Sequence, residues 1–134
     1  MRTQGRMQST TVPRWQRILG LVITVLQALT LVMGGVMKLS HQPELMQGLG
    51  AAGFTPSAIS ALGVVELVCA VLYLIPQTAV LGVVLITGYL GGATAVHVQV
   101  GEPVITPVII GAVFWLGLWL RDPRLRALLP LRLK

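Results

Sequence analysis

Four long apolar runs, separated by short polar connections, constrain this chain more than any other feature of its sequence. They cover residues 18–37, 58–75, 79–98 and 104–120. A helix rises 1.5 Å per residue, so a run of about 20 residues reaches across the roughly 30 Å hydrocarbon core of a bilayer. The pattern predicts an all-α membrane protein, a bundle of four transmembrane helices.

The composition agrees with lipid as the solvent for most side chains. Of the 134 residues, 54% are hydrophobic and only 10% are charged, which is too little polar material to cover the surface of a soluble domain. Four spans of about 20 residues already use more than half of the chain. We therefore expect a single membrane domain over residues 1–134, with short tails at residues 1–17 and 121–134.

The basic residues predict the orientation of the bundle. Four of the ten Lys and Arg residues lie in residues 2–17, five lie in residues 121–134, and Lys38 is the tenth. Lys and Arg close to the spans favour the cytoplasmic side, so both termini are expected in the cytoplasm. Nucleic-acid binding is not expected, because the basic residues flank the apolar runs and do not alternate with aromatic ones. The anionic head groups of membrane lipid are the expected counter-charge for these basic residues.

The aromatic residues provide a second indication of orientation. Trp and Tyr favour the interface between membrane and water. Four of them fall near the predicted cytoplasmic ends of the spans: Trp15, Tyr73, Trp115 and Trp119.

Glu66 is the most informative single residue, because it lies inside the second apolar run. An exposed carboxylate at that depth costs several kcal/mol, so we expect Glu66 to face the bundle interior. The candidate partners in a ligand-binding group are Gln27 and Thr87 near mid-membrane, and Lys38 and His97 toward the outer ends. Two alternatives stay open for Glu66: a ligand or proton site, or a hydrogen bond that only fixes helix packing. Lys38 and His97 have plain interfacial roles as their alternatives.

Small residues on the runs predict where helices pack closely. Little hydrophobic effect drives helices together in lipid, so Gly and Ala allow the backbones to approach. Packing within the chain is the expected role, and a dimer interface is the alternative. The residues concerned are Gly34, Gly63, Gly88, Gly91 and Gly92.

Residue patterns typical of catalysis are missing from the sequence. Cys69 is the only cysteine, which excludes an internal disulfide and a Cys-rich metal site. His41 and Glu44 have a spacing that suits a metal, but no third ligand lies nearby. We find no nucleophile paired with a base and no cofactor loop, so we expect no catalytic residue, no metal site and no stand-alone enzyme activity. A transporter is disfavoured because the two halves show no inverted repeat.

Several motifs resemble the DoxX-like family, in order and with matching spacing, over about residues 20–130. They are GGVMKL at residues 34–39, EL at 66–67, LIP at 74–76, TGYLGGA at 87–93 before His97, and WLGLWLRD at 115–122. The resemblance implies a bacterial protein with four helices in the inner (cytoplasmic) membrane. The wider family includes a membrane subunit associated with quinone-linked thiosulfate oxidation and eukaryotic assembly factors for membrane receptors.

Two hypotheses of function follow from the buried carboxyl, the outer polar groups and the glycine faces of the predicted bundle. The first is an accessory membrane subunit whose pocket near Lys38, Glu66 and His97 holds a quinone or a lipid-like molecule and supports a redox partner. The alternative is an assembly or scaffolding protein that binds the transmembrane helices of another membrane protein, without small-molecule chemistry. Because Cys69 is the only thiol, a direct role in sulfur redox chemistry is disfavoured.

Overall fold

Helices make up nearly all of residues 12–128, which are the residues that this computed structural model describes. No strand occurs in that part of the chain, so the predicted all-α class is confirmed. Two helices are short, α2 (Pro43–Ala51) and α6 (Pro123–Leu128). Four are long: α1 (Arg14–Leu39), α3 (Pro56–Leu74), α4 (Ala79–Val100) and α5 (Ile105–Arg121).

The long helices correspond one by one to the four apolar runs. Three of them, α1, α3 and α4, are long and apolar enough to cross a membrane. Helix α5 is also apolar but shorter, with 17 residues, or about 26 Å of helix. Large apolar side chains such as Leu26, Met33 and Val98 are more than half exposed. This outward apolar surface is what a lipid environment requires.

Proline, threonine and glycine set the helix ends. Pro43, Pro56 and Pro123 each occupy the first position of a helix, where the missing N–H removes no helical hydrogen bond. Thr55 caps α3, because its Oγ1 accepts a hydrogen bond from the Ala58 amide at 3.2 Å. Gly101 ends α4 with φ of 74°, a left-handed conformation that glycine adopts without strain. These short breaks keep the connections between long helices tight.

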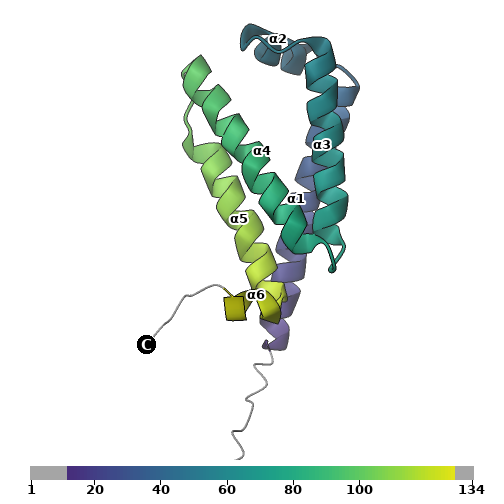
Figure 1. Cartoon of the computed structure of the whole chain (residues 1–134), viewed down its shortest axis with the longest axis vertical. Coiled ribbons are helices and arrows are strands. Elements are labelled where there is room, and N and C mark those ends of the chain that lie inside the picture. The colour runs from purple at the N-terminus through teal and green to yellow at the C-terminus, as the bar shows by residue number, and fades with distance from the viewer. Residues whose placement is uncertain (1–11, 129–134) are drawn as a thin grey trace, which may run out of the picture.

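The long helices form two antiparallel pairs that diverge toward one end (Figure 1). Helices α1 and α3 pack side by side, α4 packs on α5, and the pairs meet through α1 with α5 and α3 with α4. In Figure 1 the pairs touch at the lower end and separate at the upper end, where α2 lies. Helices α1 and α6 meet at the lower end, where Arg126 Nη2 donates to Gln16 Oε1 at 2.9 Å.

The buried core lies at the lower end, where all four long helices meet. Tyr73, Phe114 and Val83 are fully buried there. The Tyr73 hydroxyl donates to the Phe114 carbonyl at 2.8 Å, and the two rings meet edge to face with centroids 5.0 Å apart. Tyr73 lies near the end of α3, as predicted, but its ring is buried in the bundle and is not exposed at the interface. Its hydroxyl finds a backbone partner inside the bundle, so the residue does not need water.

The predicted packing glycines fall into two groups. A Cβ atom added at Gly63 would lie 2.9 Å from the Gly35 carbonyl oxygen, and one added at Gly34 would lie 2.9 Å from Glu66 Oε2. These glycines therefore lie where α1 and α3 approach most closely. A Cβ added at Gly88, Gly91 or Gly92 would meet no atom of the described residues within 4 Å.

The prediction of packing within the chain is wrong for Gly88, Gly91 and Gly92. They lie near the middle of α4, which diverges from α3 toward the upper end (Figure 1). The small residues there leave room that no other described helix fills.

Candidate functional site

A cavity of about 820 Å³ lies between the two helix pairs in the half of the bundle where they diverge. Helices α1, α2 and α3 line one side, and α4 and α5 line the other. Most of the wall is apolar, and it includes Leu45, Leu49, Phe54, Leu62, Leu90, Val96 and Ile110. A few polar side chains also line it: Lys38, Glu66, Tyr89, His97, Glu102 and Thr106. An apolar pocket with a few converging polar groups is the usual form of a small-molecule site.

Lys38 and Glu66 form a buried ion pair on the wall of this cavity. Lys38 Nζ lies 3.0 Å from Glu66 Oε1 and 2.9 Å from Oε2. The residues are only 9% and 7% exposed. Lys38 comes from the last turn of α1 and Glu66 from the middle of α3, and Gly34 leaves the space that the carboxylate occupies. The neighbouring cation makes a carboxylate tolerable at this depth.

Tyr89 connects this ion pair to the second helix pair. Its hydroxyl, carried by α4, donates to Glu66 Oε1 at 2.6 Å. A hydroxyl bound to an ionised carboxylate at this distance makes a strong, charge-assisted hydrogen bond. Lys38, Glu66 and Tyr89, which we call the polar network, thus join helices α1, α3 and α4.

Tyr89 was not predicted as a site residue from the sequence, although one signal pointed to it. It lies in the middle of the third apolar run, away from the interfaces that tyrosine prefers. A phenolic hydroxyl at that depth needs a hydrogen-bond acceptor, and Glu66 is an acceptor at similar depth.

His97 lines the same cavity but stays outside the polar network. Its Nδ1 lies 2.8 Å from the Ala93 carbonyl oxygen, which can only accept, so this nitrogen carries a hydrogen. Its Nε2 lies 3.5 Å from Glu102 Oε2, close to the turn between α4 and α5. His97 therefore lies nearer the end of the bundle than the polar network does.

Gln27 and Thr87, the other two predicted ligand-binding residues, do not line the cavity. The Thr87 hydroxyl accepts a hydrogen bond from Trp115 Nε1 at 2.9 Å and donates to the Val83 carbonyl at 2.8 Å. Gln27 is half-buried on α1, three turns before Lys38. The structure thus brings Lys38, Glu66 and His97 to one cavity and leaves Gln27 and Thr87 elsewhere.

No group of three or more potential metal ligands among His, Cys, Asp and Glu occurs within residues 12–128. His41, one of the two residues with metal-like spacing, has its Nε2 2.8 Å from Ser60 Oγ. This contact joins the turn after α1 to α3, at the same end of the bundle as the cavity.

The comparisons with known proteins identify the family. The model of the DoxX-like family matches residues 22–120, which include the whole polar network and His97. No curated protein and no solved structure matches the chain. The matched segment contains most of the chain and all four long helices except the first turns of α1 and the last residue of α5. This chain therefore belongs to the DoxX-like family and is a multi-pass membrane protein.

Proposed function

We propose that this chain is an accessory subunit of the bacterial inner membrane whose cavity binds a quinone or a lipid-like molecule and supports a redox partner protein. The observation that carries the proposal is the polar network of Lys38, Glu66 and Tyr89 on the wall of an otherwise apolar cavity. Charged groups within a membrane domain are costly, and they commonly mark functional sites.

The proposal includes four spans with both ends of the chain in the cytoplasm. Helix α5 reaches about 26 Å and spans the membrane as the fourth helix. Arg14 and Arg17 at the start of α1 lie at the same end of the bundle as Arg121 and Arg124. By the positive-inside rule this end is cytoplasmic. The cavity then lies in the outer half of the membrane.

The chemistry of the cavity fits an amphipathic ligand with carbonyl oxygens. Lys38 has three N–H donors, so its ammonium can donate to a ligand oxygen while it stays paired with Glu66. His97 Nε2, nearer the mouth, is an acceptor in the neutral imidazole because Nδ1 carries the hydrogen, so it suits a hydroxyl group of the ligand. The apolar walls suit an isoprenoid or acyl chain, and 820 Å³ is ample for a quinone head group. Electron transfer would belong to the partner protein.

Tyr89→Phe is expected to weaken ligand binding about tenfold, because the polar network loses the hydroxyl that joins α4 to Glu66. The binding of decylubiquinone to the protein in lipid nanodiscs would be measured by native mass spectrometry. Tyr73→Phe is the matched control: it also removes one buried tyrosine hydroxyl, but Tyr73 does not line the cavity. Equal affinity in wild type and Tyr89→Phe, or equal losses in both variants, would argue against the cavity as the binding site.

The open glycine face of α4 favours a second candidate function, the scaffold. A Cβ atom at Gly88, Gly91 or Gly92 would meet no other described helix. Gly88 and Gly92 also line the cavity, so a helix of another membrane protein that packs on this face would enter the gap between the two helix pairs. Two results together would favour the scaffold over the accessory subunit. The wild type would bind no quinone, and crosslinks from α4 to a co-purified membrane protein would be lost in Gly92→Leu.

A further inference from the structure

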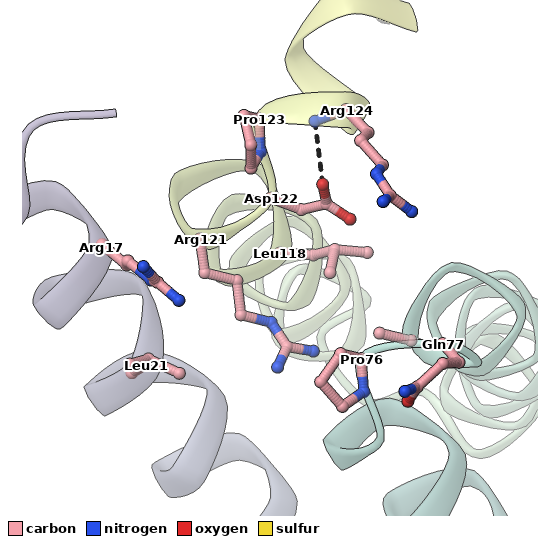
Figure 2. A pocket seen from close by; sticks show the side chains of 10 residues that line it. Arg17, Leu21, Pro76, Gln77, Leu118, Arg121, Asp122, Pro123 and Arg124 are labelled. Atoms are coloured by element: carbon pink, nitrogen blue, oxygen red, sulfur yellow. Dashed lines mark hydrogen bonds between the residues drawn. The ribbon is translucent and has the colours of Figure 1, made fainter. Parts of the chain in front are cut away.

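A second pocket lies at the opposite end of the bundle from the cavity, and the proposed function does not use it. Its volume is about 450 Å³, and it lies between α1, the turn from α3 to α4, and the junction of α5 with α6. Three arginines line it: Arg17, Arg121 and Arg124. Figure 2 shows Arg17 extending from α1 toward Arg121, and Arg124 extending from the start of α6 beyond Asp122. We call this site the arginine pocket.

Arg121 is held in place by the bundle and keeps an unused donor. Its Nη2 donates to the Tyr73 carbonyl oxygen, and its guanidinium carbon lies 5.1 Å from the centre of the Tyr73 ring. Its Nε is buried and has no hydrogen-bond partner among the described residues. A buried donor without a partner is costly. The buried Nε cannot reach a ligand, but Nη1 has no hydrogen bond to the described residues, so the guanidinium is a fixed positive charge whose Nη1 can donate to a further acceptor.

The carboxylate in the arginine pocket does not neutralise the three arginines. Asp122 Oδ1 accepts a hydrogen bond from the Arg124 backbone amide at 2.8 Å, which is a local turn contact. Within residues 12–128 the ion pairs are Lys38 with Glu66 and His97 with Glu102, so Asp122 takes part in none. The pocket thus carries three guanidinium groups and one carboxylate, a net charge of about +2.

We propose that the arginine pocket binds the phosphate group of an anionic phospholipid. Guanidinium groups bind phosphate oxygens through paired, charge-assisted hydrogen bonds. With the four spans proposed above, on which this inference rests, the pocket lies at the depth of lipid head groups, and basic pockets between membrane helices bind such head groups. Leu21, which is exposed, also lines it and provides apolar contact for the glycerol and the first acyl carbons. A free phosphate ion would not use these apolar contacts.

To test this, phosphatidylglycerol is titrated into delipidated protein in a neutral detergent. Native mass spectrometry counts the lipid molecules bound to each protein. The wild type is expected to bind one phosphatidylglycerol at least tenfold more tightly than phosphatidylcholine. The double variant Arg17→Gln/Arg124→Gln is expected to lose about tenfold in phosphatidylglycerol affinity. Both side chains are exposed and have no side-chain hydrogen bond to another described residue, so the fold should survive.

Arg14→Gln is the matched control, because Arg14 is exposed on the same turn of α1 as Arg17 but does not line the pocket. Its affinity should stay within about twofold of the wild type. An equal loss in Arg14→Gln, or no loss in the double variant, would show diffuse charge attraction and overturn the proposal. A separate titration with inorganic phosphate distinguishes the source of the anion. Phosphate binding without preferential phosphatidylglycerol binding would overturn the assignment to a lipid.

Discussion

Glu66→Ala is expected to lower the free energy of unfolding by about 3–5 kcal/mol, because it leaves the Lys38 ammonium buried without a counter-charge. Lys38 is 9% exposed, and within residues 12–128 its side-chain hydrogen bonds both go to Glu66. The same substitution also removes the acceptor of the Tyr89 hydroxyl. The change would be measured by thermal or denaturant unfolding of the protein in a fixed lipid composition.

The double variant Lys38→Met/Glu66→Leu is the control for this prediction. It replaces both charges with apolar side chains of similar volume, so no uncompensated charge remains. We expect it to recover most of the stability lost in Glu66→Ala, while ligand binding in the cavity stays lost. A double variant as unstable as the single variant would show that the cost comes from disturbed packing and not from the isolated ammonium.

Gly82→Ala is expected to destabilise the fold by about 3 kcal/mol, at the upper end of the usual cost of overpacking. A Cβ atom at Gly82 would lie 2.6 Å from the Tyr73 amide nitrogen and 2.8 Å from the Tyr73 Cα. These are backbone atoms of α3, so no side-chain rotation can relieve the clash. The two helices would have to separate at the end of the bundle where the core lies. The loss would appear as a lower unfolding temperature in lipid nanodiscs.

Gly91→Ala is the matched control on the same helix. A Cβ there meets no atom of the described residues within 4 Å, and alanine is favoured over glycine in a helix by up to about 1 kcal/mol. We expect this variant to be as stable as the wild type or slightly more stable. A similar loss of stability in both variants would mean that general flexibility of α4, and not close contact with α3, requires glycine at residue 82.

The sequence predicted the helices well, because their causes are local. The apolar runs are long, Pro56 begins the second long helix, and Pro76 and Gly101 interrupt the pattern after the second and third runs. Glu66 was expected to face the interior because a membrane leaves a carboxylate few alternatives. Lys38 was among the proposed partners of Glu66 because its long side chain can reach inward from the end of the first span.

The parts that were missed depend on how the helices diverge. Periodicity does not give a crossing angle, so the sequence could not show that α4 leaves α3 beyond its first half. Gly88, Gly91 and Gly92 were therefore expected to pack, and they face open space. The same geometry places Tyr89 against Glu66 and leaves Thr87 beside Trp115. The sequence did not show that Tyr73 is buried, because an exposed and a buried tyrosine near a helix end look alike in sequence.

The central claim is that the cavity with the polar network binds a quinone. Its most direct test is to photolabel the protein in nanodiscs with an azidoquinone and to map the labelled peptides. We predict labelling of cavity-lining positions such as Leu62, Leu90 and Val96, with loss of that labelling in Tyr89→Phe and on addition of unlabelled quinone. Labelling confined to outward-facing residues of α1 such as Leu26 and Leu29, unaffected by competitor or by Tyr89→Phe, would contradict the account.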